Sequence, residues 1–165
     1  MSARNSPLRV SDKNAFALLE IIGGECAGAL SLYPQGVAPL ASKKEDIEVL
    51  DQQKLHEILA LLKKRPLLAG YDGLRLSLAG AQEKIAVGLQ NNHIALIHGN
   101  TPTTHILKPV IEDIESSVYN EFFCMRLAKL IGLDVPQVEI RTVKDTPYYL
   151  IERYDRIKDA SGKTI

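Results

Sequence analysis

The stretch Leu76-Ser77-Leu78-Ala79-Gly80-Ala81-Gln82-Glu83-Lys84 decides what fold the chain is expected to adopt. Apolar residues alternate with polar or small ones on both sides of it, at Leu74, Leu76, Leu78, Ile85, Val87 and Leu89. This period of two predicts a strand, a tight turn and a second strand. The small residues 79–81 could let backbone N–H groups face an anion, because no bulky side chain blocks the approach. Most hairpin turns with one glycine bind nothing, so a plain turn remains the alternative.

The bulk composition is that of an ordinary globular domain. The chain has 165 residues, 45% of them hydrophobic and 24% charged, with a formal net charge of +0. A neutral chain gives no electrostatic argument for binding nucleic acid or membranes. No apolar run approaches the roughly 20 residues of a membrane helix, and the N-terminus lacks a signal-peptide pattern. Cys26 and Cys124 are therefore expected to be free, buried thiols in a cytoplasmic protein.

The first third of the chain predicts a mixture of helix and strand. A short helix is expected over 14–22, capped by Asp12 or Asn14, followed by a strand over 26–33. Residues 47–50 read as a short strand or the start of a helix. Asp51 is expected to cap a helix that ends near Lys64, before Pro66, with Leu residues and Ile58 along one apolar face.

The rest of the chain predicts a β-rich block interrupted by one helix. Strands are expected over 74–79, 84–89, 94–97 and 104–108, with a turn at Asn91-Asn92. A helix is expected over 117–131, capped by Ser116 or Ser117, with a broad apolar face. Its apolar residues are Val118, Phe122, Met125, Leu127, Leu130 and Ile131. A hairpin then joins strands near 138–142 and 148–151.

Four segments, in this order, resemble the HipA family of bacterial toxin–antitoxin Ser/Thr protein kinases. They are Ser-Leu-Ala-Gly-Ala-Gln-Glu-Lys at 77–84, Thr-Pro-Thr-Thr-His-Ile-Leu-Lys at 101–108, Ser-Val-Tyr-Asn-Glu-Phe-Phe-Cys at 117–124 and Ile-Glu-Arg-Tyr-Asp-Arg at 151–156. The resemblance covers roughly residues 74–156, and 14–62 more loosely. It implies an α+β fold, a protein-kinase-like small lobe with an antiparallel sheet and one packed helix. Residues 67–165 would form this lobe and residues 1–66 an N-terminal α+β extension, with the large catalytic lobe absent.

The resemblance also assigns an ATP site. The turn would supply backbone donors over the phosphates, Lys108 the fixed cation, and Glu121 the carboxylate that holds it. The segment at 152–154 would present its backbone to the adenine edge. The implied ATP-binding residues are Ala79, Gly80, Ala81, Gln82, Glu83, Lys84, Lys108, Glu121, Glu152, Arg153 and Tyr154. Taken singly, a lysine at a strand end is usually a solvated edge residue and a helix glutamate is usually at the surface. The order of the four segments is what favours the site.

Regulation and catalysis follow from the same resemblance. Ser77 occupies the position of an autophosphorylated serine that switches the family's kinases off, and a phosphate there would repel those of ATP. ATP would be used with Mg²⁺, which such a kinase holds through a catalytic Asp…Asn…Asp set. After Tyr154 only Asp155 and Asp159 remain, with no Asn. The chain is therefore expected to contain no catalytic or metal-binding residues and to transfer no phosphate unaided.

The implied partners are a DNA-binding antitoxin and a protein substrate such as an aminoacyl-tRNA synthetase. The front is shorter than is usual in the family, so the missing subdomain could be a separate small protein that acts as a partner. A truncated piece or a fragmentary gene would explain the same shortness. Two other interpretations stay open: a non-catalytic partner- or nucleotide-binding module from a split or decayed kinase, and a plain α+β domain.

Overall fold

A computed structural model describes residues 14–17, 32–33, 35–37, 46–64, 82–98, 101–157 and 160. The predicted strand at 74–79, most of that at 26–33, and the residues Cys26, Ser77 and Asp159 lie outside the described residues. So does the domain boundary predicted near residue 66. Residues 15–17 are helical, and Asn14 Oδ1 accepts a hydrogen bond from the Ala17 N–H at 3.1 Å, the helix start predicted there.

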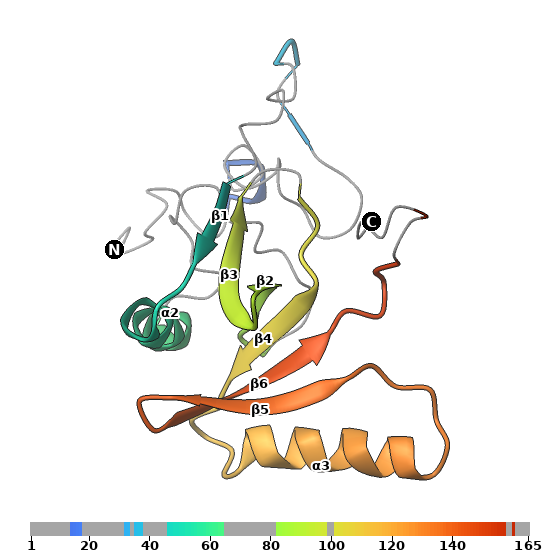
Figure 1. Ribbon diagram of the computed structural model, residues 1–165. Helices are drawn as coiled ribbons and strands as arrows, with labels where there is room; N and C mark the ends of the chain where they lie inside the picture. Colours follow the sequence, from blue (N-terminus) through green and yellow to red (C-terminus); the bar gives the residue numbers. More distant parts are fainter. Residues whose placement is uncertain are drawn as a thin grey trace.

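The core of the structure is one antiparallel sheet of six strands in the order β1-β3-β2-β4-β6-β5. The strands are β1 (Asp46–Val49), β2 (Ile85–Gln90), β3 (His93–His98), β4 (His105–Pro109), β5 (Val138–Val143) and β6 (Thr146–Glu152). The helices are α2 (Gln52–Lys64) and α3 (Ser117–Leu130). The sheet twists strongly, so that β1 and β3 run across the direction of β5 and β6 (Figure 1). This is the mixed, sheet-based fold class that the sequence predicted.

Two tight turns fix the register of the hairpins. Asn91 and Asn92 join β2 to β3 with φ of 47° and 68°, and Lys144 and Asp145 join β5 to β6 with φ of 44° and 64°. Positive φ at both central residues is the two-residue hairpin geometry that matches strand twist, and Asn and Asp tolerate it best. Both turns were predicted from their sequences.

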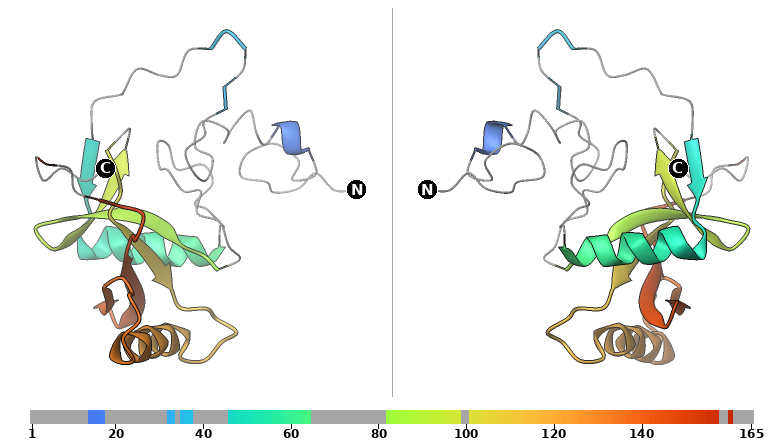
Figure 2. Two further views of the ribbon diagram at one scale, coloured as in Figure 1. Left: turned by 90° about the vertical axis from the view of Figure 1, so that its right-hand side faces the viewer. Right: turned by 90° about the vertical axis from the view of Figure 1, so that its left-hand side faces the viewer.

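Helix α2 covers one face of the sheet and builds the main core with it. Asp51 Oδ1 accepts a hydrogen bond from the Lys54 N–H at 2.8 Å, the predicted N-cap. Helix α2 lies across the sheet (Figure 2), and its apolar face is buried against inward residues of the strands. The core residues are Leu50, Leu55, Ile58, Leu59, Leu62, Ile85, Val87, Ile94, Leu96, Leu107, Val143, Tyr148 and Leu150. The described part of the N-terminal extension therefore shares its sheet and its core with the rest of the chain.

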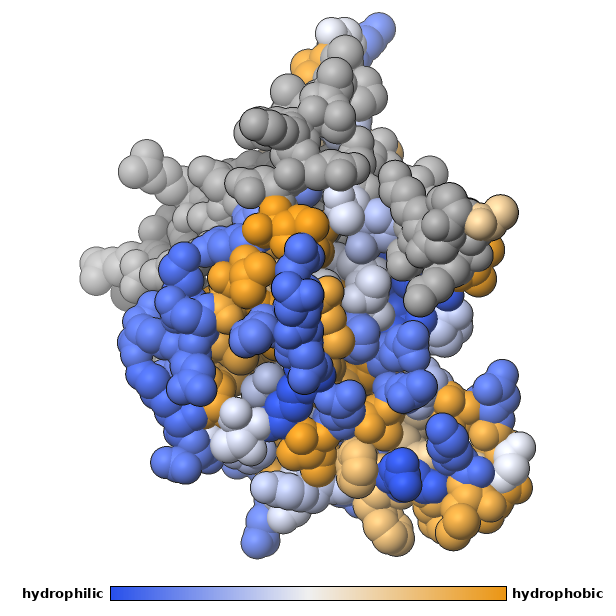
Figure 3. Space-filling model, in the orientation of Figure 1, coloured by the Kyte–Doolittle hydropathy of each residue, from blue (hydrophilic) through white to orange (hydrophobic). Residues whose placement is uncertain are grey.

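Helix α3 contradicts one prediction. Val118 is buried and Phe122 and Met125 are half-buried, whereas Leu130 is 83% and Ile131 69% exposed, so the first half of the predicted apolar face is covered and the rest lies at the surface. Apolar surface is visible over α3 in Figure 3. Cys124, predicted to be buried, is free but exposed, because it lies on a part of α3 that no strand covers. Periodicity identifies apolar positions on a helix but not what packs against them.

The start of α3 also differs from expectation. Ser116 is the N-cap residue by position, but its φ is 57° and its side chain makes no capping hydrogen bond. The hydroxyl of the buried Ser117 instead accepts a hydrogen bond from the Ile111 N–H at 2.9 Å. This bond ties the loop after β4 to the first turn of α3. Of the described helices, none is long and apolar enough to cross a membrane.

We expect Leu59→Ala to lower the free energy of unfolding by about 2–5 kcal/mol, because the substitution leaves a cavity between α2 and the sheet. Leu59 is 1% exposed. Leu130→Ala, at a position 83% exposed, is the matched control and should change stability by less than about 0.5 kcal/mol. Urea unfolding measures both. Equal losses in the two variants would contradict this packing of α2.

Candidate functional site

The sheet has two faces with different roles, and Lys108 lies on the face away from α2. Side chains alternate along β4, so Leu107 points into the core under α2 while Lys108 points to the other side. In the register between β4 and β6, Lys108 lies opposite Tyr149. Helix α3 contacts β5 and β6 and lies on this second face, so Lys108 faces α3.

An ion pair joins the strand to the helix. The Lys108 ammonium donates a hydrogen bond to Glu121 Oε1, which lies one turn into α3. The side chains are 18% and 29% exposed, so the pair is sheltered yet reachable from solvent. The structure thus brings together the two residues that the sequence analysis linked.

A second lysine lies close to this pair. The Lys84 ammonium donates to the backbone carbonyl of Gln82 at 2.8 Å. Partial burial lowers the pKa of Lys84, and the charge of Lys108 lowers that pKa further, while Glu83 and Glu121 act in the opposite direction. The two ammonium groups therefore share one electrostatic environment. The end of the predicted loop, from Gln82 into β2, lies beside Lys108, whereas Ala79, Gly80 and Ala81 are outside the described residues.

Lys108 also has an aromatic neighbour that the sequence analysis did not single out. Its Nζ lies 5.6 Å from the centroid of the Tyr149 ring, within the range of a cation–π contact. The signal that could have found it is the alternation in β6, which places every second residue on the face of Lys108. The contact itself could not be predicted, because local patterns do not show which residue of β6 lies opposite Lys108 of β4.

The exit segment after β6 is held by backbone hydrogen bonds. The Glu152 N–H donates to the carbonyl of Gln137 and the Arg153 N–H to the carbonyl of Thr104, each at 2.9 Å. Both N–H groups are therefore already used within the chain. Tyr154 is 89% exposed, and Glu152 points to the face opposite Lys108.

Side chains reinforce this exit segment. Arg153 donates to both carboxylate oxygens of Asp155, at 2.8 and 2.5 Å, and to the Thr103 hydroxyl at 3.0 Å. Arg156 Nε donates to the Thr103 carbonyl at 2.9 Å. The Arg153 hydrogen bond lowers the pKa of Asp155, with smaller contributions from the charges of both arginines. Asp155 is thus an anchor for arginines. The contacts of these arginines with Thr103 could not be predicted from the sequence, because Thr103 lies 50 positions from Arg153 and 53 from Arg156.

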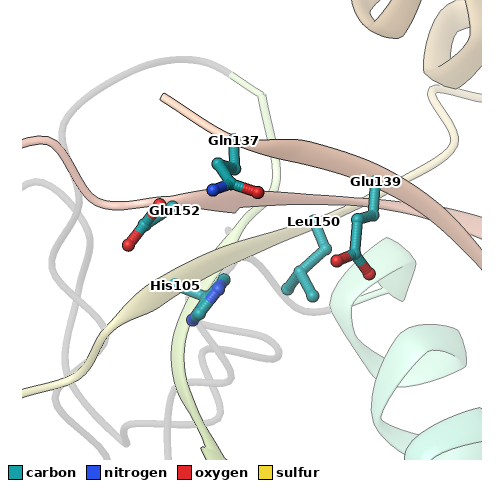
Figure 4. A pocket seen from close by; sticks show the side chains of 5 residues that line it. All are labelled: His105, Gln137, Glu139, Leu150 and Glu152. Atoms are coloured by element: carbon teal, nitrogen blue, oxygen red, sulfur yellow. The ribbon is translucent and has the colours of Figure 1, made fainter. Parts of the chain in front are cut away.

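The cavity seen in Figure 4 lies on the face of the sheet opposite Lys108. It has a volume of about 190 Å³ and is lined by His105, Gln137, Glu139, Leu150 and Glu152. These residues share the face of Leu107, opposite Lys108. Burial lowers the pKa of His105, which favours its neutral form, and two glutamates repel an anion. The described residues contain no group of three or more acidic, His or Cys side chains that could hold a metal ion.

A known protein family covers the part of the chain that contains β2 to β6 and helix α3. The family described as HipA-like C-terminal domain matches residues 76–164, more than half of the chain. The chain belongs to this family. The resemblance drawn from the four sequence segments is therefore confirmed, together with the kinase-like fold class that it implied.

Relatives extend the HipA-like match to most of the chain. The chain is 47% identical to "Putative kinase Y4mE" of Sinorhizobium fredii over 94% of its own length and 38% of that protein. It is 33% identical to the serine/threonine-protein kinase toxin HipA of Shewanella oneidensis, over 90% of this chain and 33% of that one. It thus spans about a third of the length of these relatives.

A solved structure agrees with the HipA-like match. A chain from the complex of HipA, HipB and operator DNA of Shewanella oneidensis MR-1 superposes with a TM-score of 0.64 and 28% identity. The alignment covers 94% of the present chain and 36% of the other.

We expect Lys108→Met to raise the pKa of Lys84 towards its ordinary value, because the substitution removes a repelling positive charge and frees Glu121 to attract. The rise should be partial, since burial of Lys84 remains. An NMR titration of the lysine side chains measures it. Lys129→Met, at an exposed lysine in the last turn of α3, is the control and should leave the Lys84 pKa unchanged. An unchanged Lys84 pKa in Lys108→Met would refute the coupling.

Proposed function

We propose that this chain is the ATP-binding small-lobe portion of a HipA-like Ser/Thr protein kinase. The observation that carries the proposal is the Lys108–Glu121 ion pair on the face of the sheet opposite the core. In phosphoryl-transfer enzymes of the kinase type, such a pair fixes a cation against the nucleotide phosphates. Family membership supports the assignment, because relatives of this chain carry kinase names.

The described residues suit a triphosphate. Lys108 is a fixed cation that is partly open to solvent, and Lys84 adds a second positive charge beside it. A cluster of positive charge in a sheltered place attracts phosphate oxygens strongly. In the proposal, the backbone of residues 79–84 covers the phosphates, and Mg²⁺ arrives bound to ATP, because Mg²⁺ in such sites is held largely by phosphate oxygens and water.

For the adenine, the proposal uses the exit segment Glu152, Arg153 and Tyr154. Because the N–H groups of Glu152 and Arg153 already donate within the chain, the available contacts are backbone carbonyls and the exposed ring of Tyr154. A carbonyl oxygen has two lone pairs and can accept the amino group of adenine. Aromatic rings also stack on bases.

The catalytic step needs groups that we do not assign to this chain. A kinase requires a base aspartate and metal-binding Asn and Asp residues. Asp155 is engaged by Arg153 on both oxygens. We therefore propose that the 165-residue chain binds nucleotide without transferring phosphate, and that the whole kinase acts on a protein substrate in the cytoplasm, such as an aminoacyl-tRNA synthetase. The solved HipA–HipB–DNA complex supports the proposal of a DNA-binding antitoxin partner, and a separate small N-terminal subdomain protein is a second proposed partner.

Nucleotide binding tests the proposal directly. We expect the chain to bind the ATP analogue AMP-PNP with Mg²⁺, and Lys108→Ala to weaken binding at least about tenfold, because a charged hydrogen bond to phosphate is lost. Lys129→Ala removes an equal charge at an exposed site of α3 and should bind like the unmodified chain. NMR titration measures dissociation constants even when binding is as weak as the millimolar range. If the unmodified chain shows no binding, or if Lys108→Ala binds equally well, the ATP site is wrong, and a partner-binding module or plain domain remains.

Ser77 is the proposed autophosphorylation site of the whole kinase. After incubation of the full-length protein with ATP and Mg²⁺, mass spectrometry should find phosphate on Ser77, and the phosphorylated form should bind ATP weakly, because two phosphate groups repel each other. Ser77→Ala should abolish the modification, while Ser116→Ala, at an exposed serine, should retain it. A phosphate found only elsewhere, or none, would reject this role.

A further inference from the structure

Tyr149 lies next to the ion pair between Lys108 and Glu121. It is opposite Lys108 in the register of β4 and β6, and the Lys108 ammonium lies 5.6 Å from its ring centroid. Its side chain is 0% exposed, so the ring is fixed by packing. The charge of Glu121 adds to burial in raising the pKa of the Tyr149 hydroxyl. The ring therefore sits next to both members of the pair.

The contact of Tyr149 with Lys108 comes from its ring and not from its hydroxyl. This buried oxygen has no hydrogen-bond partner among the described residues. Because a buried hydroxyl without a partner is costly, phenylalanine should be tolerated at this position, and the role argued below belongs to the ring alone. What the tyrosine supplies to its surroundings is the ring, whose electron-rich face attracts a cation.

We propose that the ring of Tyr149 is a positioning element for Lys108, one that holds its ammonium where Glu121 and a bound phosphate can both reach it. The inference rests on the nucleotide site proposed above. A lysine side chain has several freely rotating bonds, and one carboxylate fixes only its tip. The ring restricts the movement of the ammonium group on the side of the sheet, while Glu121 restricts that movement on the side of α3.

The neighbouring tyrosine provides a control within the same strand. Tyr148 is also buried, at 3% exposed, but it points to the opposite face and belongs to the core beneath α2. Replacing either tyrosine by leucine removes a similar volume from the sheet. A purely structural role of Tyr149 would make the two substitutions equivalent.

The test compares binding of AMP-PNP with Mg²⁺ by NMR titration, which observes folded molecules, alongside thermal unfolding. Tyr149→Leu should weaken binding roughly fivefold, the scale of a lost cation–π contact. Tyr149→Phe keeps the ring and should bind within about twofold of the unmodified chain, with unchanged or higher thermal stability. Tyr148→Leu should lower the unfolding temperature and leave the affinity unchanged.

The outcomes separate this inference from the proposed function. If Lys108→Ala has no effect on binding, the nucleotide site itself is wrong. If Lys108→Ala weakens binding but Tyr149→Leu binds like the unmodified chain, or if Tyr149→Phe loses as much affinity as Tyr149→Leu, the site stands and the role of the ring is overturned. Should Tyr149→Leu fail to fold, Tyr149→Met takes its place, because methionine adapts to irregular gaps.

Discussion

The ion pair between Lys108 and Glu121 is the constraint on which the second face of the structure depends. Helix α3 buries Ser117 and Val118 and half-buries Phe122 and Met125, so apolar packing holds mainly its N-terminal part against β5 and β6. The pair is partly exposed, and such pairs add little to stability. The pair nevertheless links the charge on β4 directly to the first turns of α3. A change in the position of α3 would therefore change where the cation lies.

The two faces of the sheet divide stability from chemistry. On one face, α2 and the strands form a continuous apolar core, and the residues that make it up among those described are all hydrophobic. On the other face lie Lys84, Lys108 and Glu121, with Tyr149 beneath them. Alternation along each strand makes this division possible, because neighbouring residues such as Leu107 and Lys108 belong to different faces. A charged side chain can thus be the sequence neighbour of a core residue and still point away from the core.

Local chemistry was predictable from the sequence, and long-range placement was not. The strands after residue 84, the Asn91-Asn92 turn and the Asp51 cap follow from periodicity and turn residues, and all were predicted. The pairing of Lys108 with Glu121 was inferred from the family resemblance, not from spacing. Only the first half of the apolar face predicted on α3 is covered, and Cys124, predicted to be buried, is exposed, because an apolar stripe does not show how much of it a sheet covers. The neighbourhood of Tyr149 depends on the β4–β6 register, which local patterns do not specify.

The exit segment shows how the fold restricts recognition beyond the phosphates. Arg153 and Arg156 both reach Thr103, just before β4, so the chain that leaves β6 is bound to the chain that enters the lysine strand. A backbone hydrogen bond from the Arg153 N–H to the Thr104 carbonyl reinforces the connection. A segment held this firmly cannot re-aim its N–H groups towards a ligand without breaking sheet bonds. The N–H groups of Glu152 and Arg153 are therefore committed to hydrogen bonds within the sheet and its edges.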